Sequence, residues 1–135
     1  MVNGSDSDGH PTTSHNDHGP IPARRDDEHL LAIDAGTGTI RAVLFDVAGR
    51  QVAEGRREWS HSADPAVPGS QVFDAAGNWS LVAKCVRDAV GAIADPASIR
   101  AVSCCSMGGG LVLYDGTGME LWACANGDAR AGREA

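Results

Sequence analysis

A chain of 135 residues has room for one folded domain, and this one carries a formal net charge of −7 with a pI near 5.0. Its basic residues include a single lysine, Lys84, and form no basic stripe, which argues against nucleic acid as a partner. No stretch approaches the run of about 20 apolar residues that spans a bilayer, and the amino terminus lacks a signal-peptide layout. We therefore expect a soluble, cytoplasmic protein with no membrane partner.

The first 29 residues differ in composition from the rest of the chain. They are rich in Gly, Ser, Asp, His and Pro and hold almost no large apolar side chains. Such a segment cannot bury enough surface to offset the entropy lost on ordering, so we predict a disordered acidic and His-rich tail over residues 1–29. His10, His15 and His18 suggest a metal site, but no cysteine or carboxylate cluster supports one, and solvated histidines are favoured.

Residues 30–135 are predicted to fold, beginning with three strands. Residues 30–33 and 40–45 are apolar strands across a Gly-rich turn, and residues 51–59 form a third strand after a second short turn. Three consecutive strands on short turns predict an antiparallel meander. Residues 60–72 contain Pro65, Pro68 and Gly69 and are predicted to be a loop.

A helix and three further strands follow. Asp74 is a suitable N-cap, and Asp95-Pro96 ends the predicted helix. Residues 99–106 form a continuous apolar run, which predicts a strand buried on both faces. Residues 111–114 and 120–125 then pair across the turn at 115–118. The apolar residues that recur at helical spacing, and that we expect on the buried face of the helix, are Trp79, Val82, Ala83, Val86, Val90 and Ile93.

The four cysteines lie in apolar segments and form no CxxC pair. A reduced cysteine in such a segment behaves as a small hydrophobic residue, so a structural role is favoured over metal binding or redox chemistry. The three tryptophans are likewise expected to serve in packing. These residues are Cys85, Cys104, Cys105 and Cys124, with Trp59, Trp79 and Trp122.

The predicted order, βββαβββ, is informative about the fold class. A meander, a helical crossover and a returning strand open the ribonuclease-H-like, or actin-like ATPase, fold of the α/β class. In nucleotide-binding members of that fold, the turn between the first two strands wraps the phosphates. The expected architecture is therefore a partial amino-terminal domain of this fold.

The turn after the first strand has the chemistry that a phosphate site needs. Two glycines allow the backbone to approach an anion, two threonines add hydroxyl donors, an arginine can bind a phosphate oxygen and an aspartate can hold hydrated magnesium. A bare hairpin turn is an equal alternative from these residues alone, whereas a Walker P-loop is excluded because no Gly-Lys-Ser/Thr follows. The predicted phosphate ligands are Gly36, Thr37, Gly38, Thr39 and Arg41, and the predicted metal ligand is Asp34.

A second Asp-Gly-Thr-Gly sequence at residues 115–118 is similar to this turn, but no arginine follows it. An anion there would meet an aspartate without a cation beside it. We therefore predict a plain hairpin turn.

Several co-linear stretches resemble the amino-terminal domain of the FGGY carbohydrate kinases. Residues 34–41 with 44–46 resemble the first phosphate motif of that family, and residues 99–103 and 122–130 match later positions. Other stretches, above all Trp-Ala-Cys-Ala-Asn at residues 122–126, are similar to the autoinducer-2 kinases of this family. The resemblance covers nearly all of residues 30–135 and favours the phosphate site over the bare hairpin.

The resemblance implies an ATP-dependent carbohydrate kinase that uses ATP and Mg²⁺ to phosphorylate a hydroxyl group of a small sugar or polyol. It places Asn126, Asp128 and Arg130 beside the substrate, whereas the residues alone would favour a solvated hairpin end with a local ion pair. Autoinducer-2 and glycerol kinases have an arginine–glutamate pair facing the substrate after the position of Met107. This chain has Gly108 and Gly109 there, so the side chains that would bind a polyol in those kinases are absent. The resemblance therefore implies a substrate side formed by Met107, Gly108 and Gly109 together with Asn126, Asp128 and Arg130.

The kinases of this family are several times longer than this chain, and their catalytic base and adenosine-binding domain lie beyond the matched region. We expect a carboxy-terminal kinase portion to be missing and the 135-residue chain to be inactive by itself. Two alternatives stay open. The chain could be a non-catalytic remnant or binding module that keeps the fold, or a ribonuclease-H-like nuclease with Asp34 as a metal ligand, which the acidic composition disfavours.

Overall fold

A three-stranded antiparallel meander begins the fold. The computed structural model describes residues 27–132, and in it β1 (His29–Ala35) pairs with β2 (Thr39–Asp46), which pairs with β3 (Gln51–Glu58). The predicted meander is therefore confirmed. The tail predicted over residues 1–29 lies outside the described residues as far as residue 26, and His10, His15 and His18 with it.

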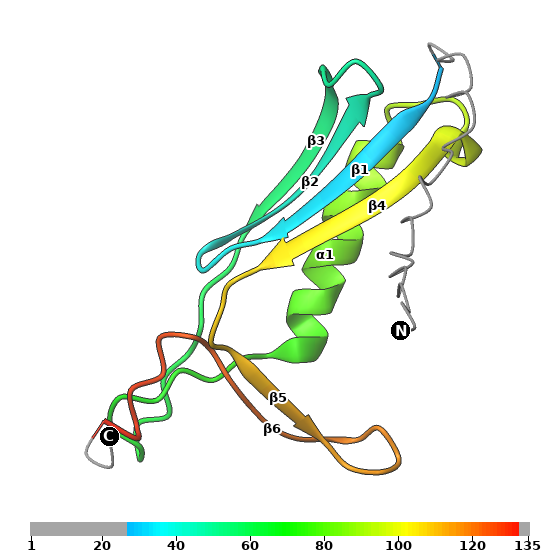
Figure 1. Cartoon of the computed structure of the whole chain (residues 1–135). Helices are drawn as coiled ribbons and strands as arrows, with labels where there is room; N and C mark the ends of the chain where they lie inside the picture. Colours follow the sequence, from blue (N-terminus) through cyan, green and yellow to red (C-terminus); the bar gives the residue numbers. More distant parts are fainter. Residues whose placement is uncertain (1–26, 133–135) are drawn as a thin grey trace, which may run out of the picture.

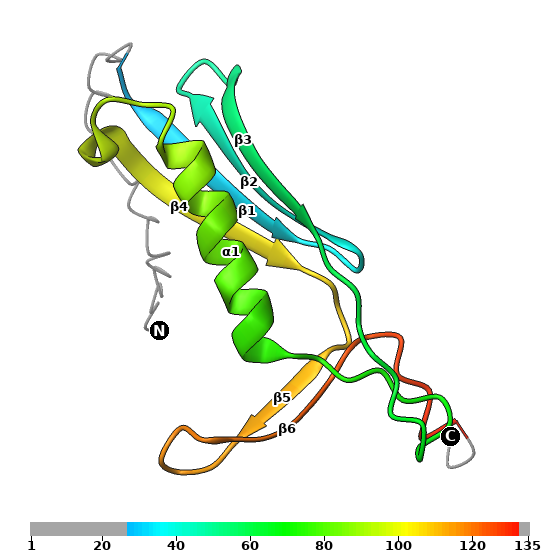
Figure 2. The ribbon, with the colours of Figure 1, turned by 180° about the vertical axis from the view of Figure 1, so that it is seen from behind.

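A helical crossover returns the chain to the sheet. α1 (Ala75–Val90) begins after Asp74, whose carboxylate accepts a hydrogen bond from the Gly77 N–H at 2.9 Å. After the short 3₁₀ helix η1 (Pro96–Ser98), β4 (Ile99–Ser106) pairs parallel with β1 and completes a sheet of order β3-β2-β1-β4. α1 covers one face of this sheet, as the two opposite views show (Figures 1 and 2).

The last two strands form a separate hairpin. β5 (Leu111–Tyr114) and β6 (Glu120–Cys124) pair antiparallel, and an isolated bridge joins Val72 to Cys124. The hairpin projects beyond the end of the main sheet (Figure 1). Its turn is closed by the Asp115 carboxylate, which accepts hydrogen bonds from the N–H groups of Thr117 and Met119. These bonds explain the predicted hairpin turn, since the aspartate satisfies the turn's own donors.

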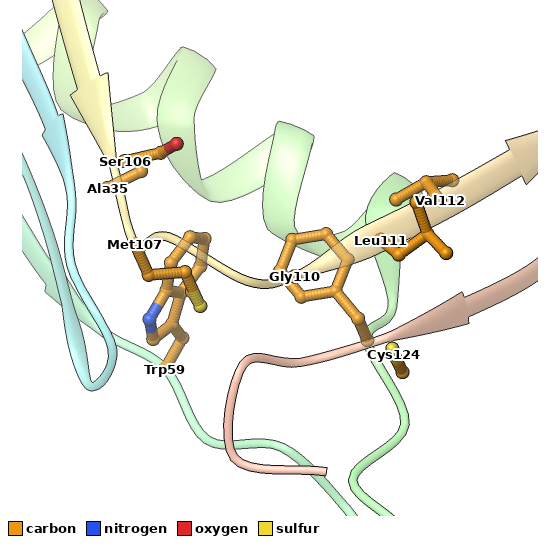
Figure 3. Close-up of a pocket in the computed structure, with 9 residues that line it drawn as sticks. Ala35, Trp59, Ser106, Met107, Gly110, Leu111, Val112 and Cys124 are labelled. Carbon is orange, nitrogen blue, oxygen red and sulfur yellow. The ribbon is translucent and has the colours of Figure 1, made fainter. Parts of the chain in front are cut away.

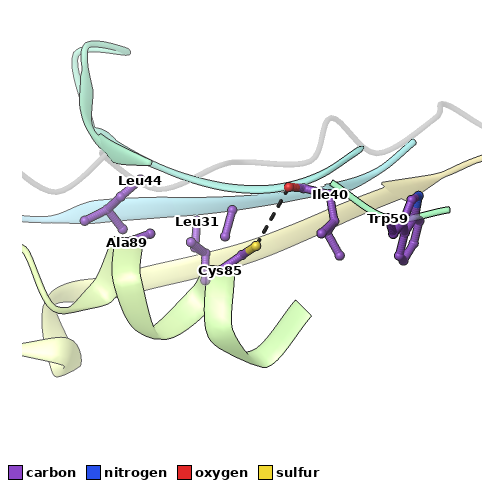
Figure 4. Close-up of a cluster of buried hydrophobic side chains, with 7 residues drawn as sticks. Leu31, Ile40, Leu44, Trp59, Cys85 and Ala89 are labelled. Atoms are coloured by element: carbon purple, nitrogen blue, oxygen red, sulfur yellow. Dashed lines mark hydrogen bonds between the residues drawn. The ribbon is translucent and has the colours of Figure 1, made fainter. Parts of the chain in front are cut away.

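The core lies between α1 and the sheet. Alternation along β2 directs Ile40, Ala42 and Leu44 toward the helix, and all three are fully buried. Cys85 and Ala89 of α1 pack against them, and the Cys85 thiol lies 3.8 Å from the carbonyl oxygen of Ile40 (Figure 4). Burial also raises the pKa of the Cys85 thiol. The structural role predicted for this cysteine fits its position.

A glycine permits the close contact between α1 and β3. A Cβ atom built on Gly55 would lie 2.1 Å from the carbonyl oxygen of Cys85, far inside van der Waals contact. The backbone of β3 can therefore approach the helix only because residue 55 has no side chain.

The predicted buried face of α1 is right in part, since Val82, Val86, Val90 and Ile93 pack against the core, and wrong in part. Trp79 is 70% exposed, whereas Asn78, Cys85 and Ala89 are the buried residues of the helix. The helix ends at Val90, before Ile93, and Gly91 caps it. Each helical residue rotates the side-chain direction by about 100°, so a shift of one position takes the indole from the sheet to solvent.

The expectation that residues 99–106 are buried on both faces is also wrong for the part of the chain that the structure describes. β4 is the edge strand of its sheet, and Arg100 to Ser106 are all exposed. α1 packs across β2 and β3 and leaves β4 uncovered. Cys104 and Cys105 are therefore exposed rather than core residues, contrary to their predicted role.

Within residues 27–132, no helix is long and apolar enough to cross a membrane.

Candidate phosphate-binding site

Four side chains form a row across the sheet on the face opposite α1. Strand register places Asp34 of β1 beside Arg41 of β2 and Cys105 of β4, and it places Arg41 beside Arg56 of β3. Because Ile40 and Gly55 face the helix, their neighbours Arg41 and Arg56 face away from it. The Arg41 guanidinium donates to Asp34 Oδ2 at 2.5 Å, and the Cys105 thiol lies 3.4 Å from Asp34 Oδ1.

The Asp34 carboxylate is held in its charged form. The hydrogen bond from Arg41, followed by that from the Cys105 thiol, holds the pKa of Asp34 below its ordinary value. The side chain is 36% exposed, so a ligand can reach it from solvent. An exposed, ionised carboxylate suits hydrated Mg²⁺, which keeps several waters and takes one or two carboxylates together with substrate phosphates.

No group of three or more His, Cys, Asp or Glu side chains that could hold a metal ion occurs among residues 27–132. A dedicated all-protein metal cage is therefore not what these residues would form. The donor set fits magnesium that is shared between Asp34, water and a bound phosphate.

The turn between β1 and β2 is held from behind by Trp59. The Gly36 N–H donates to the Thr39 carbonyl at 2.9 Å and closes the turn. The indole N–H of Trp59 then donates to the carbonyl oxygens of Gly36 and Thr37 at 2.9 and 3.1 Å. This turn lies at the end of the sheet nearest the β5–β6 hairpin (Figures 1 and 2).

The Trp59 contacts orient two backbone donors. In a planar trans peptide the C=O and N–H groups point in opposite directions. The carbonyls of Gly36 and Thr37 point toward the indole, so the N–H groups of Thr37 and Gly38, which lie in the same peptide planes, point away from it. Neither N–H group donates to an acceptor among the described residues. The turn therefore offers adjacent free N–H donors, the kind of backbone arrangement that binds anions.

The structure brings all six predicted residues of this turn to one open depression on the surface. It also adds Arg56, which the motif did not indicate. The register between β2 and β3 shifts by one residue between Leu44 and Phe45, and this shift sets Arg56 opposite Arg41, so the sequence offered no local signal for Arg56. The seven lining residues are Asp34, Gly36, Thr37, Gly38, Thr39, Arg41 and Arg56.

Part of the predicted substrate side lies against this turn. The Asn126 amide is 3.4 Å from the Thr37 hydroxyl, and a Cβ built on Gly109 would lie 3.7 Å from the Asn126 Cβ. Gly109 has a φ of +84°, the left-handed region that favours glycine. The Met107 N–H donates to the Ala35 carbonyl at 2.9 Å, and the Cβ position of Gly108 is open. Asn126 therefore contacts the turn and Met107 contacts the end of β1, and the binding role of these residues stays a prediction.

Asp128 and Arg130 are engaged with one another. Arg130 donates to both carboxylate oxygens of Asp128, which also accepts from the Gln71 N–H at 2.8 Å. The Arg130 hydrogen bonds, followed by that from Gln71, hold the pKa of Asp128 well below its ordinary value. The Arg130 guanidinium stacks 5.1 Å from the centre of the Trp122 ring. These contacts join the loop at residues 60–72 to the chain after β6, and neither side chain lines the depression.

An apolar pocket lies between the end of the sheet and the hairpin. Figure 3 shows Trp59 and Met107 on one side of it and Cys124 on the other. Its walls offer packing surface and few hydrogen-bonding groups. The lining residues are Ala35, Trp59, Phe73, Ser106, Met107, Gly110, Leu111, Val112 and Cys124.

Known proteins with similar sequences include the autoinducer-2 kinases of several bacteria. The chain is 55% identical over 107 residues to the autoinducer-2 kinase of Salmonella typhimurium, a match that covers 78% of this chain. It is 55% identical over 108 residues to that of Yersinia pestis. Over these residues the chain is a homologue of the autoinducer-2 kinases. It spans about a fifth of the length of these relatives, 20% in each case. No family model matches the chain.

Solved structures of sugar kinases share the fold. Gluconate kinase from Lactobacillus acidophilus superposes with a TM-score of 0.71 and 20% identity, over 79% of this chain and 21% of that one. Xylulose kinase from Rhodospirillum rubrum superposes with a TM-score of 0.68 and 24% identity, over 79% and 22%. The expected resemblance to part of an FGGY carbohydrate kinase, with the actin-like ATPase fold, is therefore confirmed.

Proposed function

We propose that this chain forms the phosphate-binding part of an ATP-dependent carbohydrate kinase that transfers a phosphoryl group to a hydroxyl of a sugar or polyol. The observation that carries the proposal is the depression in which the free N–H groups of Thr37 and Gly38 lie beside Arg41 and Asp34. The homology to autoinducer-2 kinases supports the reaction class. We place the reaction in the cytoplasm, because ATP is available there.

The residues of the depression would have different roles in binding. The turn N–H groups and the threonine hydroxyls would hold phosphate oxygens, and the Arg41 guanidinium would neutralise their charge. Asp34 would hold magnesium, which, when bound, neutralises further phosphate charge. If Asp34 gave up its hydrogen bond from Arg41 on holding the metal, that guanidinium would be free to bind the phosphates.

The acceptor substrate would lie on the side of Met107, Gly109 and Asn126. Asn126 reaches the Thr37 hydroxyl, so a sugar held there is next to the phosphate end of the site. Gly108 and Gly109 leave that side open, with no charged side chain to read vicinal hydroxyl groups. Asp128 and Arg130 would act on the substrate indirectly, by fixing the loop that precedes α1.

The described residues supply no separate general base. Among residues 27–132, Asp34 is the one carboxylate that lines the depression, and its oxygens are engaged by Arg41 and Cys105. General-base catalysis contributes about 10²–10⁴-fold in rate. We therefore expect ADP release by this chain to stay at background with glycerol, pentoses or 4,5-dihydroxy-2,3-pentanedione. Turnover that Asp34→Ala abolishes would contradict this and would exclude the alternative of a non-catalytic binding module.

Titration calorimetry of the full 135-residue chain with Mg-ATP tests the proposal. Asp34→Ala and Arg41→Ala should each weaken binding about tenfold, since each removes a charge-assisted contact. Arg57→Ala and Asp88→Ala are matched controls, because these residues form an exposed ion pair of similar geometry elsewhere, at 2.6 Å. Equal affinity in all five proteins would exclude the phosphate site.

A further inference from the structure

Arg41 and Arg56 face one another across β2 and β3, and their surroundings differ. Arg41 is paired with Asp34, whereas Arg56 forms no ion pair with any residue that the structure describes. Glu54 and Glu58 flank Arg56 along the same strand, yet neither forms an ion pair with it. Like charges directly opposite in an antiparallel pair repel one another. The charge of Glu54 acts on Arg41, but no carboxylate of the described residues lies within ion-pair distance of Arg56.

The depression is positive although the chain is acidic. Its lining holds two guanidinium groups and one carboxylate, which leaves one net positive charge in a chain of net charge −7. The next residue, Arg57, shows the ordinary arrangement, since it pairs with Asp88. An anion in the depression would supply the counter-charge that Arg56 lacks.

We propose that Arg56 is a second phosphate-binding arginine, which together with Arg41 clamps the polyphosphate of a nucleotide across β2 and β3. The inference rests on the proposed function of this site and adds a ligand that lies outside its sequence motif. Adjacent strands are about 4.8 Å apart, so two long arginine side chains on them can reach one polyphosphate chain. The planar guanidinium suits paired hydrogen bonds to phosphate oxygens.

The pairing in the structure also gives the two arginines different parts in binding. Arg41 is engaged by Asp34 until a ligand separates them, whereas Arg56 is available from the start. Arg56 would therefore make the first contact with an arriving polyphosphate, and Arg41 would join once magnesium occupies Asp34. A charge that attracts the ligand before docking has an effect that salt screens.

Binding of magnesium tripolyphosphate to the full chain tests the proposal without the adenosine. Calorimetric titrations at low and moderate salt would compare wild type with Arg56→Gln, Arg56→Lys and Arg41→Ala. Arg87→Gln on the exposed side of α1 removes the same charge and is the matched control. Arg56→Gln should bind about threefold to tenfold more weakly and lose affinity less steeply with salt. Arg56→Lys should keep the salt dependence while losing part of the affinity.

The outcomes separate the two proposals. If Arg41→Ala weakens binding and Arg56→Gln does not, the phosphate site stands and Arg56 is not one of its ligands. Equal weakening by Arg56→Gln and Arg87→Gln would show an effect of overall charge and would overturn the clamp. No binding by wild type would overturn both proposals. Circular dichroism of each variant checks folding, and should Arg56→Gln fail to fold, Arg56→Lys decides by its affinity.

Discussion

The indole N–H of Trp59 lies 2.9 Å from the carbonyl oxygen of Gly36 and ties the end of β3 to the turn between β1 and β2. The same N–H contacts the Thr37 carbonyl at 3.1 Å. Trp59 is 9% exposed, and its ring packs edge-on against Phe73, with 6.0 Å between centroids. A buried, well-packed side chain therefore fixes the orientation of an exposed and glycine-rich turn.

Trp59→Phe should weaken phosphate binding and have a smaller effect on the stability of the fold. Phenylalanine keeps an aromatic ring in the packing and loses the N–H, so the free donors of the turn are no longer held outward. We expect magnesium tripolyphosphate to bind about twofold to tenfold more weakly, the range for one lost hydrogen bond, with altered amide NMR signals for Thr37 and Gly38. Trp79→Phe is the control, since Trp79 is 70% exposed. Unchanged amide signals in Trp59→Phe would contradict this role.

Gly55→Ala should destabilise the domain strongly. The added Cβ would meet the backbone of Cys85 at 2.1 Å, and backbone cannot move aside as a flexible side chain can. Forced overpacking of this kind costs about 1–3 kcal/mol, occasionally more. Urea denaturation would measure the loss. Gly116→Ala is a matched control, because nothing lies within 4 Å of its Cβ position. Similar midpoints for the two variants would refute the close helix–strand contact.

Asp128→Asn should lower the stability of the fold at neutral pH and lower it less at acidic pH. The pKa of Asp128 is lowered in the folded protein by Arg130 and Gln71, so the ionised carboxylate stabilises the fold above the unfolded-state pKa of about 3.9. That stabilisation is lost as the pH falls from this value toward the lowered pKa. The thermal midpoint of the variant should therefore lie several degrees below wild type at pH 7, and the gap should narrow below pH 4.

For a control variant, the difference in thermal midpoint from wild type should not narrow in the same way at low pH. Glu120→Gln alters an exposed carboxylate that forms no ion pair with the described residues. A gap for Asp128→Asn that stays constant from pH 7 to pH 2 would show that the Arg130 and Gln71 contacts do not stabilise the ionised form.

The cysteines should differ in their reaction with iodoacetamide. Cys85 is fully buried and its thiol pKa is raised by burial, so it should stay unmodified in the native protein. Cys104 is exposed and should be alkylated under the same conditions. Mass spectrometry before and after unfolding in urea would locate the labels. Rapid native labelling of Cys85 would mean that α1 opens readily from the sheet.

Local signals were sufficient to predict the elements. Alternating apolar residues in β2, the N-cap at Asp74 and the Asp115 turn each act over a few neighbouring residues. For that reason the order of strands and helix, the hairpin turn and the six residues of the first turn could be read along the chain. The kinase resemblance extended this reading to Asn126, which does reach the turn.

The sequence by itself determined the elements, their order and the motif around Asp34, because each depends on residues close together in the chain. Only the tertiary structure decided that Trp79 faces solvent, that β4 is left uncovered, and that Trp59 and Arg56 join the turn. Those outcomes depend on where α1 crosses the sheet and on the register between strands. Both are set by packing between distant segments, and no local periodicity encodes them.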